Sequence, residues 1–229
     1  RIMNPTNAVL EQRIAAMEGG IGGLAVASGM AAITYAIQCL CEVGTNIVST
    51  SQVYGGTYNL FAHTLPRQGI EARMIKADDF TAFENAIDDN TRAVFCESIG
   101  NPAGNIVDIE RLARIAHSKG VPLIVDNTVA TPYLCRPFEL GADIVVHSLT
   151  KYINGHGTAI GGMIVDSGKF DWKANATRFA MMNEPDPSYH NVVYTEAFAE
   201  AAFIGRCRVV PLRNTGAALA PKNASDILI

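Results

Sequence analysis

The chain has 229 residues, of which 48% are hydrophobic and 17% charged, a composition typical of one globular domain with a substantial core. Its net charge of -4 and its isoelectric point near 5.7 argue against a nucleic-acid-binding protein. No apolar run approaches the roughly 20 residues that a membrane-spanning helix needs, and no secretory signal is visible, so we expect neither a membrane protein nor a secreted one.

The cysteines give a similar indication. There are five of them, an odd number without C-x-x-C spacing, which supports neither a disulfide framework nor a zinc site. We therefore expect a cytoplasmic protein without a metal. The chain starts at Arg1 without a methionine and stops inside an apolar run at Ile229, so we expect it to be part of a longer polypeptide.

Two helices are predicted at the start of the chain. The first begins at Thr6, after Asn4-Pro5, and ends at Gly19-Gly20. Its predicted apolar face consists of Leu10, Ile14 and Met17. Ser28 is predicted to open the second helix. The predicted apolar face of that helix consists of Ile33, Ile37 and Leu40.

Strand-like and helical segments then alternate. The short apolar runs predicted as strands are Asn46–Ser49, Ala72–Ile75, Ala93–Cys96, Leu123–Val125, Ile144–Val146 and Gly161–Val165. The helical stretches predicted between them are Thr57–Leu65, Phe80–Ile87 and Ile109–Ser118. Beyond Asp166 the pattern weakens, and two prolines predict a loop at Asn183–Ser188. The alternation favours an α/β fold with a parallel sheet.

Polar side chains follow several of these strands, at the edge where open α/β sheets bind ligands. Asp126 ends the run Val121–Val125, and a carboxylate at the end of a buried strand needs a cationic or hydrogen-bonding partner. A structural aspartate or a helix cap explains this position equally well. After another strand come Ser148 and Thr150, two residues apart and able to bind one oxyanion, and then Lys151. Taken alone, Lys151 reads as a surface lysine.

The third polar cluster is Ser28-Gly29-Met30, at a predicted helix start. Free backbone N–H groups there favour an anion, and Gly29 would allow its close approach, although a plain serine cap is a common alternative. Together with the hydroxyls of Ser148 and Thr150, this cluster indicates a phosphate. A phosphate site, a lysine amine and a carboxylate indicate pyridoxal 5′-phosphate, whose aldehyde forms a Schiff base with lysine and whose ring nitrogen pairs with a carboxylate.

One glycine-rich segment points elsewhere. Gly155–Gly161 approaches the dinucleotide-binding pattern G-x-G-x-x-G, with one residue too many. It also leads into a predicted strand, whereas that pattern opens a helix. We therefore do not expect nucleotide binding.

At this point the chain resembles the Cys/Met-metabolism pyridoxal-phosphate enzymes. The resemblance covers essentially the whole chain and rests on Arg1–Thr6, Ser28–Ala32, Tyr54–Thr57, Glu97–Pro102, Asp126–Thr128 and His147–Tyr152. It implies the large domain of fold type I (aspartate-aminotransferase-like), with a mostly parallel, seven-stranded sheet. Residues 1–229 would form this cofactor-binding domain, and the N-terminal arm and the C-terminal small domain would lie largely outside the chain.

The resemblance also implies roles for single residues. Lys151 would be the Schiff-base lysine and proton shuttle, and Asp126 would pair with the pyridinium. The backbone at Gly29 and Met30, with the hydroxyls of Ser148 and Thr150, would hold the phosphate.

Further implied roles fall on three more residues. Tyr54 would stack on the cofactor and act as an acid–base group, and Asn101 would bind the phenolic oxygen. Arg1 would reach the phosphate in the neighbouring subunit, which implies a homodimer with shared sites and, from the family, a homotetramer. The family's tyrosine just before Arg1 and its substrate-carboxylate arginine lie outside this chain.

The segment after the lysine favours one activity. Gly155-His156-Gly157-Thr158 is similar to the sulfhydrylase type, whereas lyases and cystathionine synthases typically have G-H-S-D. The resemblance is therefore nearest to O-acetylhomoserine sulfhydrylase, which makes L-homocysteine and acetate from O-acetyl-L-homoserine and sulfide. The alternatives are cystathionine γ-synthase, methionine γ-lyase or, from another class, a non-catalytic binding protein that keeps the fold.

Overall fold

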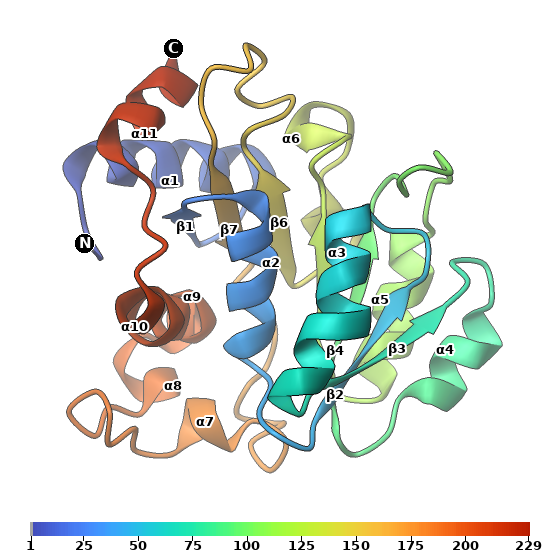
Figure 1. Cartoon of the computed structure of the whole chain (residues 1–229). Helices are drawn as coiled ribbons and strands as arrows, with labels where there is room; N and C mark the ends of the chain where they lie inside the picture. Colours follow the sequence, from blue (N-terminus) through green and yellow to red (C-terminus); the bar gives the residue numbers. More distant parts are fainter. Residues whose placement is uncertain (1) are drawn as a thin grey trace.

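The strands of the protein form a single mixed sheet, in a computed structural model that describes residues 2–229 (Figure 1). They are β1 (Gly22–Val26), β2 (Asn46–Thr50), β3 (Glu71–Ile75), β4 (Thr91–Glu97), β5 (Leu123–Asp126), β6 (Ile144–Ser148) and β7 (Gly162–Asp166). Their order is β1-β7-β6-β5-β4-β2-β3, and β7 alone runs antiparallel to its neighbours. The predicted α/β class and the mostly parallel, seven-stranded sheet are confirmed.

Helices cover both faces of this sheet. They are α1 (Pro5–Glu18), α2 (Gly29–Gln38), α3 (Gly55–Asn59), α4 (Phe80–Ala86), α5 (Ile109–Ser118), α6 (Thr131–Leu134), α7 (Ala180–Asn183), α8 (Tyr194–Ala197), α9 (Ala202–Cys207), α10 (Arg213–Thr215) and α11 (Pro221–Leu228). One apolar core joins the sheet to α2 and α9, and the other joins it to α1, α4, α5 and α11. None of the helices between residues 2 and 229 has the length and apolar character that a membrane crossing requires.

Helix α1 starts and ends as predicted, but its inward face differs from the prediction. Asn4 caps its first turn by accepting the N–H groups of Thr6 and Asn7, and Gly19 ends it with a φ of 80°. Met17 was predicted on the apolar face and is instead 44% exposed. Glu11 and Glu18 are buried in its place, because this face meets polar backbone and strand-end groups as well as apolar ones.

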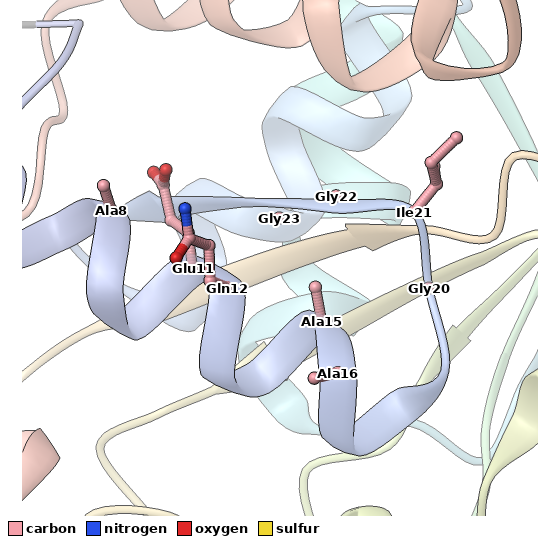
Figure 2. A pocket seen from close by; sticks show the side chains of 9 residues that line it. All are labelled: Ala8, Glu11, Gln12, Ala15, Ala16, Gly20, Ile21, Gly22 and Gly23. Atoms are coloured by element: carbon pink, nitrogen blue, oxygen red, sulfur yellow. The ribbon is translucent and has the colours of Figure 1, made fainter.

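Strand β1 was not among the strands predicted from the residue pattern. Figure 2 shows α1 running alongside Gly22 and Gly23, and residues of both segments line a groove of about 320 Å³. A Cβ atom at Gly23 would lie 2.9 Å from the Glu11 carbonyl oxygen, so glycine is what allows the helix to pack this closely. The Glu11 carboxylate then accepts the Ala25 N–H at 2.9 Å. The strand therefore depends on contacts with α1 and β7 rather than on its own β-propensity.

The glycine-rich segment Gly155–Gly161 forms a loop that leads directly into β7. Gly155 and Gly157 both have positive φ angles, which matches turns rather than a helix start. The prediction that this segment leads into a strand is confirmed.

Candidate active site

A cavity of about 430 Å³ lies at the carboxyl ends of β4, β5 and β6, beside the start of α2. The predicted site residues that line it are Gly29, Met30, Tyr54, Asn101, Asp126, Ser148, Thr150 and Lys151. The ninth, Arg1, lies outside the described residues. Gly29 and Lys151 are far apart in the chain. The sheet brings such residues together because the carboxyl ends of its parallel strands lie at one edge.

The start of α2 forms one wall of this cavity. The Ser28 hydroxyl caps the helix by accepting the Ala31 N–H at 3.1 Å, and the ten-residue helix directs its free N–H groups toward the cavity. A Cβ atom at Gly29 would lie 2.6 Å from Ser148 Cβ. Gly29 was expected to make room for an anion. The structure gives a second reason for a glycine at this position, because the start of α2 packs directly against the end of β6.

Asp126 projects from the end of β5 and is held by its neighbour Thr128. One carboxylate oxygen accepts the Thr128 N–H at 2.9 Å and the Thr128 hydroxyl at 2.5 Å. The second oxygen makes no hydrogen bond with residues 2–229. Burial raises the pKa of Asp126, and the Thr128 hydrogen bonds offset part of that effect. A cationic group in the cavity would satisfy this carboxylate.

Thr128 was missed as a site residue, although it belongs to the Asp126-Asn127-Thr128 block. Its hydroxyl donates to Asp126 and accepts the Ser148 N–H at 2.8 Å. One side chain therefore links the two polar strand ends. The available signal was its position two residues after a strand-end aspartate, which is typical of a side chain that folds back on that carboxylate.

Glu97 is a second missed residue, and it lies directly beside Asp126. The two residues are register partners on β4 and β5, so their side chains leave the sheet on the same face. Burial, and then the nearby charge of Asp126, raise the pKa of Glu97 to about 8. Its Oε1 accepts the Tyr54 N–H at 2.6 Å and so holds the loop before α3. No sequence signal reveals that two strands place these carboxylates together.

The segment after β6 supplies hydroxyl groups and the amine. Ser148 ends the strand, and its hydroxyl makes no hydrogen bond with residues 2–229, so it is available to a ligand. The Thr150 hydroxyl instead bonds the backbone of Gly161, with its N–H at 3.2 Å and its carbonyl oxygen at 3.3 Å. Lys151 is exposed at the cavity and forms no ion pair with any described residue.

Tyr54 and Asn101 lie on the loop side of the cavity. The Tyr54 side chain is half exposed, and its ring lies so close to Gly56 that a Cβ atom there would be 2.5 Å from Cε1. The Met30 sulfur borders the same point. An aromatic ring at this wall offers a flat apolar surface to a ligand ring.

The residues present fit pyridoxal phosphate. The helix start and the Ser148 hydroxyl provide donors for a phosphate, and the Lys151 amine has no competing acidic partner among residues 2–229. Asp126 offers a buried carboxylate with one oxygen that bonds none of residues 2–229, which suits a protonated ring nitrogen. The Thr150 hydroxyl is less available as a phosphate donor, because it already forms hydrogen bonds with the backbone of Gly161.

Comparison with known proteins gives the same result. A family model described as Cys/Met metabolism PLP-dependent enzyme matches residues 1–228. A homocysteine synthase of Schizosaccharomyces pombe is 55% identical over 94% of the chain and 51% of its own length. An O-acetyl-L-homoserine sulfhydrylase of Thermus thermophilus is 51% identical over 100% of the chain and 54% of its own length.

Solved structures match as well. A Campylobacter jejuni protein described as an O-acetylhomoserine (thiol)-lyase, with N′-pyridoxyl-lysine-5′-monophosphate, has a TM-score of 0.95 and 45% identity. The match covers 99% of this chain and 56% of that one. The chain thus spans about half the length of these relatives, and it belongs to the family of pyridoxal-phosphate-dependent enzymes of Cys/Met metabolism.

Proposed function

We propose that the chain is the cofactor-binding large domain of an O-acetylhomoserine sulfhydrylase, which converts O-acetyl-L-homoserine and sulfide to L-homocysteine and acetate. The observation that carries the proposal is the cavity in which a lysine amine, a strand-end aspartate and a helix start converge. Relatives with 46–55% identity that are named for homocysteine synthesis or O-acetylhomoserine sulfhydrylation support this choice of reaction.

Each residue would have a definite task. Asp126 would bind the cofactor's ring nitrogen and keep its proton in place, and the start of α2 with Ser148 would bind the phosphate. Tyr54 would lie against the ring and exchange a proton near the leaving group, and Asn101 would bind the phenolic oxygen.

Lys151 would hold the cofactor covalently and, once the substrate displaces its amine, carry protons between the substrate's carbon atoms. Pyridoxal phosphate, when bound, supplies the electron-accepting ring that stabilises negative charge at the substrate's α-carbon. The protein's part is therefore orientation and proton transfer.

The proposal includes a homo-oligomer and a cytoplasmic location. Arg1 would reach the phosphate bound by a neighbouring subunit, giving a dimer with shared sites and a tetramer of two such dimers. The cytoplasmic assignment rests on the five free cysteines, which fit a reducing compartment.

The visible absorption spectrum of the full-length protein, before and after borohydride, tests the cofactor. A yellow band that disappears on reduction, with the cofactor then attached to the peptide containing Lys151, supports the proposal. A protein that stays colourless after pyridoxal phosphate is added contradicts it and favours a binding protein.

Assay of homocysteine tests the reaction itself. We expect product only when O-acetyl-L-homoserine and sulfide are both present. Release of α-ketobutyrate and methanethiol from methionine, independent of sulfide, would identify methionine γ-lyase instead. Condensation with cysteine in place of sulfide would identify cystathionine γ-synthase.

A further inference from the structure

A fully buried polar cluster lies behind the candidate active site. Glu18, the last residue of α1, forms a hydrogen bond with His147, with 2.6 Å between Glu18 Oε1 and His147 Nε2. Both side chains are completely buried. The same Glu18 oxygen accepts the Asn127 side-chain amide at 3.0 Å, and that amide also donates to the Cys135 carbonyl at 2.9 Å.

Strand alternation relates this cluster to the cavity. Successive side chains of a strand point to opposite faces of the sheet. Asp126 and Ser148 line the cavity, so the residues next to them in the chain, Asn127 and His147, lie on the opposite face, where α1 packs. The Glu18 carboxylate therefore joins the ends of β5 and β6 from behind, directly beneath the two groups that face the cavity.

Stability alone does not explain this cluster. Among the described residues, Glu18 Oε2, His147 Nδ1 and Asn127 Oδ1 have no hydrogen-bond partner despite being buried. Each such atom costs about 1–3 kcal/mol, and apolar residues of similar volume often serve a core better than a buried charged pair. A costly cluster beside a ligand cavity points to a role in that cavity.

An electrostatic effect accompanies the contact. Burial raises the pKa of Asp126, and His147 is among the groups that oppose this effect, after the hydrogen bonds from Thr128. Glu18 holds the His147 side chain in its place behind the cavity.

We propose that Glu18 is a positioning residue for pyridoxal phosphate, an inference that rests on the proposed function. Its carboxylate fixes the separation of Asp126 from Ser148 by holding the strand-end residues behind them. The cofactor joins its ring nitrogen and its phosphate through a planar ring and a short arm, so the two protein groups that bind them must lie within a limited range of separations. Supporting residues that fix such spacing strengthen binding without touching the ligand.

The test compares Glu18→Gln with Glu11→Gln in the full-length protein. Both glutamates are buried on α1, but Glu11 contacts Ala25 and Arg208 beside the groove in Figure 2 rather than the cluster. The measurements are the dissociation constant of pyridoxal phosphate from reconstituted apoprotein, the visible circular dichroism of the bound cofactor, and the melting temperature of the apoprotein.

We expect both variants to melt at a lower temperature. Only Glu18→Gln should weaken cofactor binding about tenfold or more and change the visible circular dichroism. Glu11→Gln should keep the wild-type spectrum and an affinity within about threefold of wild type. If Glu18→Gln binds the cofactor as Glu11→Gln does, the inference is wrong while the proposed function stands.

Two further outcomes are informative. Wild-type protein that binds no pyridoxal phosphate would overturn the proposed function itself, and the inference with it. If Glu18→Gln does not fold, Asn127→Leu takes its place, because leucine has the same branched shape but cannot donate to Glu18 or to the Cys135 carbonyl, so the end of β5 is no longer held. An unchanged dissociation constant and spectrum in Asn127→Leu would overturn the inference.

Discussion

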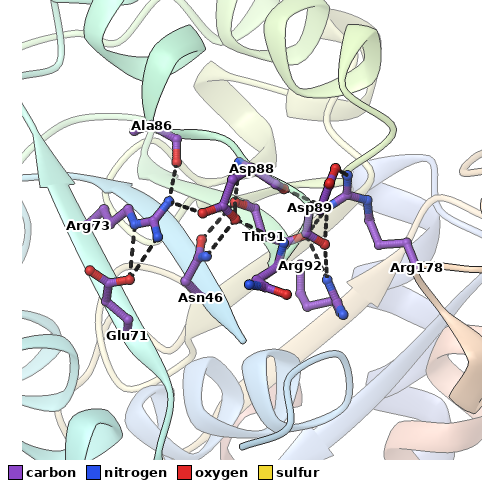
Figure 3. A network of polar contacts seen from close by, with 10 residues as sticks. Asn46, Glu71, Arg73, Ala86, Asp88, Asp89, Thr91, Arg92 and Arg178 are labelled. Carbon is purple, nitrogen blue, oxygen red and sulfur yellow. Dashed lines mark hydrogen bonds and ion pairs between the residues drawn. The ribbon is translucent and has the colours of Figure 1, made fainter. Parts of the chain in front are cut away.

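Charged residues at the two ends of strand β4 have opposite surroundings. In the turn just before the strand, Asp88 accepts hydrogen bonds from Asn46 at 2.9 Å and from Arg73 at 2.7 Å (Figure 3). Burial alone would raise the pKa of Asp88, but these hydrogen bonds hold it well below the usual range. At the other end, Glu97 faces Asp126 and forms no ion pair with residues 2–229, and its pKa is raised to about 8 by burial and then by the charge of Asp126.

The difference separates structural from functional polar groups. Around the start of β4, Arg178 also donates to the carbonyl oxygens of Asp88, Asp89 and Thr91, so backbone and side chains are mutually satisfied. Such a network stabilises the turn and leaves nothing for a ligand. At the carboxyl edge, burial raises the pKa values of Glu97 and Asp126, and neither carboxylate forms an ion pair with residues 2–229. Perturbed carboxylates in a cavity are typical of a binding site.

Removing the amine should produce the largest effect. We expect Lys151→Ala to lower sulfhydrylase activity by about a thousandfold or more, because the covalent attachment and the proton shuttle are lost together. Borohydride should then fix no cofactor to the protein. Lys222→Ala is the control, since Lys222 pairs with Asp226 on α11. Full activity in Lys151→Ala would refute the assignment.

Matched aspartate variants test the comparison most directly. Asp126→Asn keeps the size of the side chain but removes the charge that would face the ring nitrogen. An ion pair at about 4 Å is worth roughly 4 kcal/mol at an effective dielectric near 20, so kcat should fall at least about a hundredfold. Asp88→Asn should lower the melting temperature and leave kcat within about twofold. Equal losses of activity in both variants would show that Asp126 has no functional role that Asp88 lacks.

The pH dependence of the free energy of unfolding tests the raised pKa of Glu97 at the carboxyl end of β4. The folded pKa of Glu97 lies above its ordinary value of 4.5, so the folded protein binds the extra proton and is stabilised at low pH. This contribution is lost as the pH rises through about 8. Asp166, with a pKa raised to about 7 by burial, acts in the same direction. The apoprotein should therefore become less stable between pH 5 and pH 8.

Glu97→Gln should flatten this dependence, because glutamine does not titrate and can still accept the Tyr54 N–H. Denaturant unfolding of both apoproteins at several pH values measures the effect. A wild-type stability that rises across this range, or an unchanged slope in Glu97→Gln, would contradict the raised pKa.

The smallest effects are expected where ion pairs lie away from the cavity and are partly or fully exposed. Arg73→Met removes contacts to Glu71 and Asp88, which are partly exposed, so we expect a loss of about 1 kcal/mol in the free energy of unfolding. Arg114→Met, which removes an exposed pair with Glu110, should cost less than about 0.5 kcal/mol. Thermal unfolding measures both, and cofactor binding should be unchanged in each.

Much of the fold and of the candidate site was predictable because the signals are local. Strand runs that end in Asp126 and Ser148, and a helix that starts at Ser28, are read from neighbouring residues, and the structure has these elements. Parallel strands place their carboxyl ends at one edge, so the convergence of these residues on one cavity followed from the element order. The roles of the individual residues remain predictions.

By itself, the sequence determined the alternation of elements, the polar strand ends and the family. Only the tertiary structure decided which distant groups meet: β1 beside α1, Glu97 beside Asp126, and Glu18 with His147. The reason is physical. Hydrophobic periodicity and capping act over a few residues, whereas the pairing of buried carboxylates depends on sheet register and helix packing, which no short stretch of sequence encodes.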